Sequence, residues 1–329
     1  MTKRRILYGA LGSMIAWALA CSANASEKVK IRTDFTPAGS HAALHLALAK
    51  GWFRDAGLDV DLQDGKGSIN TIQLVATGEV DVGQLSVSVV PVARESGMKV
   101  KSVAGFARRS DFSVLVPATS SIKTAQDLKG KRLVLFAASP WVPMIDPFLA
   151  NVGMTRNDVQ ILFVDASAMY GTYSSGRADA VMTLAPFAAP ILAKTMPSRS
   201  IDAADYGIVL PALGLVAREE MIASRPEVLR KVVQTTIRAW EYMKNGNVAE
   251  AVQATIKNRP DAKLDPEIIE GQAKGYLAYL DTPNTKGKPI GWQSEEDWAA
   301  ATALMIKAGL IKAGPTPKDF YTNAMVSDK

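Results

Sequence analysis

The sequence predicts an α/β fold in which two lobes are joined by a two-segment hinge. Strand patterns alternate with helical patterns from residue 28 onward, which is typical of a mainly parallel sheet covered by helices. The alternation restarts near Lys123, so a second α/β unit begins there. Beyond Leu210 the composition turns helical. About 304 residues follow the first 25, which is enough for two domains that each have a core.

The first unit contains four strand patterns and the helices between them. Residues 28–33 alternate apolar and polar side chains, as a half-buried strand does, and a helix follows from His41 toward Gly51. Glycines mark the ends of several helices, because a left-handed residue commonly ends a helix. The other predicted elements of this unit are strands at 58–63, 80–85 and 100–106 and helices at 69–76 and 88–95.

The second unit repeats this pattern in a shorter form, and a helical tail follows it. Its predicted elements are helices at 124–130, 143–151 and 167–174 and strands at 132–137, 159–164 and 178–184. In the tail, Leu229, Val233, Ile237 and Trp240 recur at helical spacing after Pro226, which suits the first turn of a helix. Further helices are predicted at 248–257, 266–278 and 294–308.

We interpret the second unit as an insertion within the first. Lobe 1 would then comprise residues 26–116 and 208–329, and lobe 2 would comprise residues 117–207. The chain would cross between the lobes at Ser113–Pro117 and again at Leu213–Ala217. Two lobes joined by two crossings form a hinge with a cleft between them.

Residues 1–25 have the pattern of a secretory signal peptide. A basic start is followed by a largely apolar run at 6–20 and by the small-x-small sequence Ala23-Asn24-Ala25. The apolar run is shorter than the ~20 residues needed to span a bilayer. Leu19-Ala20-Cys21-Ser22 offers the alternative of lipidation at Cys21. We therefore expect an exported, periplasmic protein, either cleaved after Ala25 or anchored through Cys21.

Charge and cysteine content exclude several classes of function. Cleavage after Ala25 would lower the formal net charge from +6 to +3. The basic residues are not clustered, so the sequence shows no basic patch of the kind that binds nucleic acid. Cys21 is the only cysteine, so the folded part has no disulfide, cysteine–zinc site or cysteine nucleophile.

Candidate binding residues follow from the rule that ligands of open α/β sheets sit beyond the carboxyl ends of the strands. This rule selects five loops, namely residues 34–41, 65–68, 86–88, 138–141 and 185–187. Gly67 and Ser68 open a helix whose free N–H groups suit an anionic oxygen, although a plain glycine turn with a serine cap is the alternative. Ser139 offers the same geometry from the other lobe. Ser86 and Ser88 supply hydroxyl groups in the third loop.

Aromatic side chains in these loops can hold a planar ring between them. Phe35, Trp141 and Phe187 are the candidates, and the alternative for each is a place in the core beneath its loop. Arg109 follows the fourth strand and can pair with an anionic ligand, or it can lie on the solvated surface.

The two histidines of the chain, His41 and His45, stand one helical turn apart, which raises the question of a metal site. A catalytic zinc site needs about three protein ligands, and the chain has no third histidine or further cysteine, so we expect no metal. His45 shares a face with small and apolar residues and is expected to be structural. His41 opens the helix in the first loop and is expected to contact the ligand.

Five short motifs, in this order, resemble solute-binding proteins of ABC importers, in the branch that binds nitrate, sulfonate, taurine and thiamine-pyrimidine precursors. The motifs are Ala49–Val60, Gly65–Ser68, Ala76–Gly83, Ala125–Lys131 and Gly176–Ala180. The resemblance implies a type II periplasmic-binding-protein fold, capture of a ligand in the cleft and delivery to a membrane permease. The family usually has Trp-Glu-Pro after the last motif, where this chain has Thr183–Phe187 and lacks those acidic and indole contacts.

The function expected from these observations is ligand capture by lobe closure, without chemistry and without a cofactor. An aromatic carboxylate or a pyrimidine-type molecule suits the aromatic loops, and an alkanesulfonate such as taurine, or nitrate, is the alternative ligand. An exported enzyme is disfavoured, because the chain has no Gly-x-Ser-x-Gly or paired metal motif. A ligand-sensing module of a receptor would share the fold. The expected partners are the small ligand and the permease of an importer, and the protein is expected to be a monomer.

Overall fold

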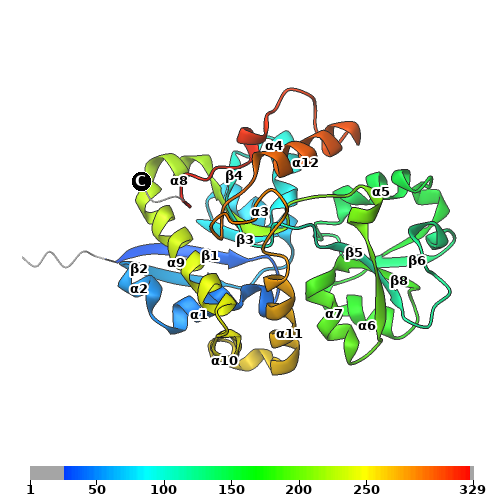
Figure 1. Cartoon of the computed structure of the whole chain (residues 1–329), viewed down its shortest axis with the longest axis horizontal. Helices are drawn as coiled ribbons and strands as arrows, with labels where there is room; N and C mark the ends of the chain where they lie inside the picture. The colour runs from blue at the N-terminus through cyan, green and yellow to red at the C-terminus, as the bar shows by residue number, and fades with distance from the viewer. Residues whose placement is uncertain (1–25, 327–329) are drawn as a thin grey trace, which may run out of the picture.

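The computed structural model describes residues 26–326 as two lobes, each built on a five-stranded sheet (Figure 1). The predicted signal peptide, including Cys21, lies outside the described residues. Within them, no helix combines the length and the apolar character that crossing a membrane requires.

The sheet of lobe 1 has the strand order β2-β1-β3-β10-β4. β1 pairs in parallel with β2 and β3, whereas β10 runs antiparallel to both β3 and β4. The strands are β1 (Glu27–Thr33), β2 (Leu58–Gln63), β3 (Val82–Ser86), β4 (Val100–Gly105) and β10 (Leu213–Arg218).

The sheet of lobe 2 has the equivalent order β7-β6-β8-β5-β9. β6 pairs in parallel with β7 and β8, and β5 runs antiparallel to β8 and β9. The strands are β5 (Phe112–Pro117), β6 (Arg132–Leu135), β7 (Gln160–Phe163), β8 (Ala180–Leu184) and β9 (Ser198–Asp202). β9 was not predicted from the sequence.

The predicted crossing segments are corrected by this topology. Ser113–Pro117 and Leu213–Ala217 lie in β5 and β10, where they form the antiparallel fourth strand of each sheet. The chain instead crosses between the sheets in the segment between β4 and β5 and in the segment that precedes β10. The first crossing leads directly into β5 and the second into β10. Each of these strands is hydrogen-bonded to a neighbour on both sides, so each crossing is attached to the interior of a sheet. The residue boundaries of the two lobes remain our proposal, with the first boundary moved ahead of β5.

Helices cover the sheets largely where the sequence predicted them. The three long tail helices match the prediction to within one or two residues, because each has a strong start signal such as Pro226, Asp265 or Ser294. The helices are α1 (Ala42–Ala49), α2 (Trp52–Asp55), α3 (Ser68–Thr77), α4 (Val90–Glu95), α5 (Ile145–Asn151), α6 (Met169–Ser174), α7 (Ala185–Ala193), α8 (Glu219–Ser224), α9 (Pro226–Lys244), α10 (Val248–Asn258), α11 (Pro266–Leu277), α12 (Glu295–Lys307) and α13 (Pro317–Phe320).

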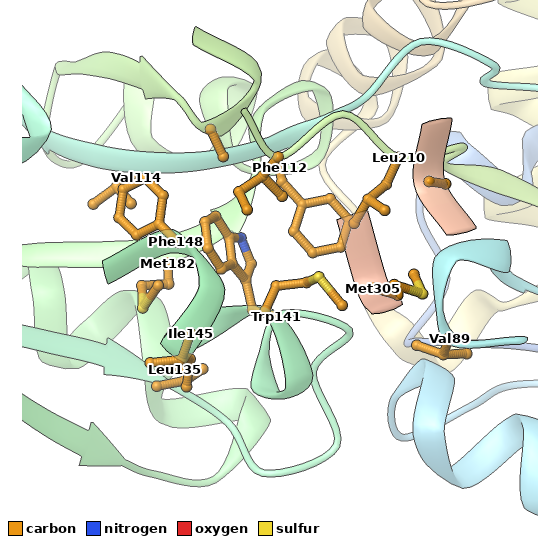
Figure 2. Packing of buried hydrophobic residues seen from close by; sticks show 14 of the residues in the cluster. Val89, Phe112, Val114, Leu135, Trp141, Ile145, Phe148, Met182, Leu210 and Met305 are labelled. Atoms are coloured by element: carbon orange, nitrogen blue, oxygen red, sulfur yellow. The ribbon is translucent and has the colours of Figure 1, made fainter. Parts of the chain in front are cut away.

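One apolar cluster continues from the core of lobe 2 across the hinge into lobe 1. Phe112 and Trp141 lie in lobe 2, Leu210 lies on the second crossing, and Val89 and Met305 belong to lobe 1 (Figure 2). All five side chains are buried. Because separating apolar contacts of this kind costs free energy, we expect the cluster to resist opening of the lobes on the hinge side.

His45 on α1 is fully buried in lobe 1 and supports the structural role expected for it. Its Nδ1 atom lies 3.4 Å from the amide nitrogen of Asn258 on α10, and its Nε2 atom has no partner among the described residues. Burial, together with the charges of His41 and Arg259, lowers the pKa of His45 to about 3. The folded state therefore holds His45 as neutral imidazole, and no described group of three or more His, Cys, Asp or Glu side chains could hold a metal there.

We expect His45 to make the protein sensitive to acid. Below the pKa of 6.5 of an unfolded histidine, the unfolded chain binds a proton that the folded chain excludes down to about pH 3. The free energy of unfolding should fall by about 1.4 kcal/mol per pH unit across this window through His45 alone. Urea unfolding of the wild type and of His45→Gln at pH 7 and pH 4.5 isolates this contribution, because the carboxylates titrate equally in both. A stability difference that is the same at both pH values would contradict it.

Candidate functional site

A cavity lies between the lobes, where the loops after β1, β2, β6 and β8 meet. Its volume is about 40 Å³, which is room for roughly three water molecules. A six-membered ring can enter only if the lining side chains rotate or the lobes part. The lining residues come from both lobes and are Asp34, Phe35, Ser40, Gly67, Ser68, Phe136, Ser139, Pro140, Met169, Tyr170, Met182, Thr183, Leu184, Phe187 and Tyr276.

Asp34 is the acidic group of this cavity, and two side chains of lobe 1 hold it in place. His41 Nε2 lies 3.0 Å from Asp34 Oδ1, and Ser68 Oγ donates to Asp34 Oδ2 at 2.8 Å. Ser68 Oγ in turn accepts the N–H group of Ser86 at 3.2 Å. The carboxylate can only accept, so its partners fix its direction and leave its remaining lone pairs for donors in the cavity. No described residue that lines the cavity is a lysine, arginine or histidine.

Aromatic side chains from both lobes line the same cavity as Asp34. The ring of Phe35 lies 5.4 Å from those of both Phe136 and Phe187, and Phe187 meets it edge-on at 88°. Tyr170 stacks near Phe187 at 6.3 Å with an interplanar angle of 22°, and its hydroxyl lies 2.8 Å from Thr183 Oγ1. Burial raises the pKa of Tyr170 above its ordinary value, so it remains a neutral phenol. These rings can stack against a planar ligand.

The first turn of α3 meets lobe 2 directly. The N–H group of Ile69 donates to the carbonyl of Ala138 across the cleft at 3.4 Å. Gly67 has a φ of 125°, and a Cβ atom there would come within 2.4 Å of Ala138 Cβ. Only glycine permits both the backbone conformation and the close approach of the lobes.

On the outer side of the cleft, α11 of lobe 1 packs against α7 of lobe 2, and Figure 1 shows the two helices side by side. Gly271 faces Pro190 and Gly275 faces Pro186, each pair one helical turn from the other. Gln272 lies between them and is buried, accepting the N–H group of Gly39 at 2.9 Å and donating to the carbonyl of Phe187 at 2.8 Å. Gln272 therefore ties the first loop of lobe 1 to an aromatic wall of the cavity.

Half of the residues predicted to bind ligand line this cavity. They are Phe35, Gly67, Ser68, Ser139 and Phe187, and their contact with a ligand remains a prediction. The cavity also includes residues that the sequence did not single out, namely Asp34, Ser40, Phe136, Met169, Met182, Thr183, Leu184 and Tyr276. Asp34 stands in a loop that was selected, and its position directly after β1 was the signal that could have found it.

The other predicted residues do not line this cavity, and their contact with a ligand stays a prediction. Trp141 is fully buried in the core of lobe 2, where its Nε1 donates to the carbonyl of Thr183 at 2.7 Å. His41 is buried behind Asp34 rather than beside the cavity. Ser86 and Ser88 are buried and pair with each other, with their hydroxyl oxygens 2.9 Å apart. Arg109 lies over the ring of Tyr279 at 4.6 Å, outside the cavity.

Residues 38–248 match the family model described as NMT1/THI5 like. A formylaminopyrimidine-binding protein of Halalkalibacterium halodurans is 28% identical over 280 residues, which cover 83% of each chain. A protein of Aspergillus parasiticus named 4-amino-5-hydroxymethyl-2-methylpyrimidine phosphate synthase is 23% identical and covers 92% of this chain and 88% of its own.

Among solved structures, the alkanesulfonate-binding protein SsuA from Xanthomonas axonopodis pv. citri, bound to MOPS, superimposes with a TM-score of 0.67 at 17% identity. The match covers 88% of this chain and 95% of that one. This similarity confirms the periplasmic-binding-protein fold that the family resemblance implied.

Proposed function

The chain belongs to the NMT1/THI5-like family, and on that premise we propose that it is the solute-binding component of an ABC importer. It would act in the periplasm as a monomer, capture a small planar organic molecule between its lobes and deliver it to a membrane permease. The relative that is named a formylaminopyrimidine-binding protein supports a pyrimidine-type ligand.

The single observation that carries this proposal is a cavity with aromatic walls, one fixed carboxylate and no described cationic side chain in its lining. Aromatic walls favour a planar ring, and Asp34 favours a ring that carries N–H donors, because its remaining lone pairs accept hydrogen bonds. We therefore propose an amino-substituted pyrimidine or a related amino-azine as the ligand. Hydrogen bonds to a charged group contribute about 1.5–3 kcal/mol each, so Asp34 can dominate the choice.

The same observation weighs against the anionic ligands expected from the sequence. An aromatic carboxylate, an alkanesulfonate or nitrate would place negative oxygens near Asp34, with no described cation in the cavity to offset the repulsion. The start of α3, which suited an anion on sequence grounds, already gives the N–H group of Ile69 to Ala138.

A thermal-shift screen of the purified protein tests the proposal. A ligand that binds only the folded state raises the melting temperature by mass action. We expect 4-aminopyrimidine and 4-amino-2-methylpyrimidine to raise it, and unsubstituted pyrimidine, benzoate, taurine and nitrate to raise it much less. Shifts with taurine or nitrate, and none with the aminopyrimidines, would refute the ligand class.

An enzyme is the rival from another class, because one relative is named a synthase. The aminopyrimidine that binds best should be recovered chemically unchanged after long incubation with the protein, as mass spectrometry can show. Stoichiometric or catalytic conversion of the ligand would favour the enzyme.

Lobe closure can be tested at the contact between α7 and α11. A Cβ atom at Gly271 would lie 3.0 Å from Pro190 Cβ, so the larger side chain of Gly271→Leu should hold the lobes apart. We expect ligand affinity to fall at least tenfold, while the free energy of unfolding stays equal or rises, because leucine favours a helix more than glycine does. Calorimetric titration and urea unfolding measure the two effects.

Gly171→Leu is the matched control, because Gly171 also lies in a helix but has open space around it. It should leave the affinity unchanged. Equal affinities of the Gly271→Leu and Gly171→Leu proteins would show that the contact between α7 and α11 plays no part in capture.

A further inference from the structure

Asp111 is a buried carboxyl group at the hinge for which the fold provides no partner. It lies on the first crossing, immediately before β5, and is 2% exposed. Neither of its carboxyl oxygens has a hydrogen-bond partner among the described residues. Buried polar groups are nearly always paired, so an unpaired carboxyl group needs an explanation.

The pairing of β5 places Asp111 beside the cavity. Side chains alternate along a strand, so Asp111 and Ser113 share one face, and Ser113 pairs with Thr183 on the same face of β8. Thr183 lines the cavity. The carbonyl of Asp111 accepts the N–H group of Ala185 at 2.8 Å. This bond extends the pairing of β5 with β8 by one residue, to the first residue of α7. Asp111 thus stands next to the hinge end of the cavity, behind the residues that line it rather than among them.

The electrostatic surroundings of Asp111 are negative or neutral. Burial and the negative charge of Asp34 together raise the pKa of Asp111 to about 8. The charges of Asp111 and Asp34 in turn help burial to raise the pKa of Tyr276, which lines the cavity on the side of α11. Tyr279 lies near Asp111, Asp202 and Arg109.

The two arginines on the same crossing are already engaged. Arg109 lies over the ring of Tyr279, and Arg108 bonds to Asp281 and to the carbonyls of Leu280, Pro289 and Trp292. Of the described groups around Asp111, none is therefore a cation that pairs with its carboxyl group.

We propose that Asp111 is a second ligand acceptor of the cavity, and that together with Asp34 it selects planar aromatic cations, of the amidinium or protonated amino-azine class, over neutral rings. This inference rests on the proposed function and specifies its ligand. A cation that reaches from Asp34 to Asp111 would supply both the missing hydrogen-bond donors and the charge that two neighbouring carboxyl groups require. Binding of the cation displaces the proton from Asp111, so the affinity should rise about tenfold per pH unit from pH 6 to pH 8.

Three probes of nearly identical shape test this inference, namely benzamidine, benzamide and benzoate, with 4-aminopyrimidine as the reference ligand. Their dissociation constants are measured by calorimetry at pH 6, 7 and 8. Benzamidine remains a cation over this range, so any pH dependence comes from the protein. We expect benzamidine to bind at least tenfold more tightly than benzamide at pH 8, and benzoate to bind most weakly.

In Asp111→Asn, the preference for benzamidine and its pH dependence should disappear, while benzamide affinity changes less than threefold. Asp205→Asn, which removes an exposed carboxyl group of the same lobe, should behave as the wild type does. Should Asp111→Asn melt earlier than the wild type, Asp111→Ser replaces it in the same titrations.

If ring ligands bind without regard to charge, or if Asp111→Asn keeps the preference, Asp111 is not an acceptor, and the proposed function stands. If neither the three probes nor 4-aminopyrimidine binds at any pH, the proposed function fails as well.

Discussion

Replacing Trp141 with alanine is expected to lower the free energy of unfolding by about 3–5 kcal/mol, because it removes the largest side chain from the core of lobe 2. The indole ring packs against Phe112 and Phe148 (Figure 2), with ring centroids 5.1 Å and 5.4 Å apart, and its Nε1 donates to the carbonyl of Thr183 at 2.7 Å. The substitution would leave a cavity and a carbonyl without its donor. Urea unfolding at pH 7 measures the loss.

Phe35→Ala is the control for this prediction. Phe35 is half-buried and lines the cavity, so its loss should cost less stability and more ligand affinity. If Trp141→Ala instead abolished binding in a protein of unchanged stability, Trp141 would be a ligand contact, as the sequence suggested.

Replacing Asp34 with alanine is expected to have the largest effect on binding. The carboxylate is the acceptor that we assign to the N–H donors of the ligand, and a hydrogen bond to a charged group contributes about 1.5–3 kcal/mol, or roughly 10- to 150-fold in the dissociation constant. The unliganded protein should also lose about 1–3 kcal/mol, because His41 is buried and Asp34 is its partner. Calorimetric titration with 4-aminopyrimidine and urea unfolding measure the two losses.

Asp64→Ala removes the same charge from a neighbouring loop, where Asp64 pairs with Arg259 and does not line the cavity. Its affinity for 4-aminopyrimidine should match that of the wild type. If the Asp34→Ala protein still binds 4-aminopyrimidine as tightly as the Asp64→Ala protein does, Asp34 does not contact the ligand.

The sequence predicted the loops of the site better than the residues within them. The rule that ligands sit beyond the carboxyl ends of strands selected the loops that contain Phe35, Ser68, Ser139 and Phe187, because strand patterns are local and visible. The direction of a side chain within a loop depends on tertiary packing, which no local pattern records. Trp141 turns into the core for this reason.

His41 and Asp34 illustrate the same limit. His41 was expected to meet the ligand because it opens a helix in the first loop, yet it is buried and holds Asp34 from behind. Tyr276 and Gln272 come from α11, more than 200 residues further along the chain, and only the packing of the tail onto the cleft brings them to the site. The crossing segments were placed wrongly because nothing in the sequence of β5 or β10 indicates which of the two sheets the strand joins.

The measurement that tests this account most directly is a crystal structure of the protein with an amino-substituted pyrimidine. The account predicts that the ring lies between the lobes against Phe35 and Phe187, with its amino group within hydrogen-bonding distance of Asp34. A ligand bound outside this cavity, or a ring whose amino group turns away from Asp34 toward solvent, would contradict it.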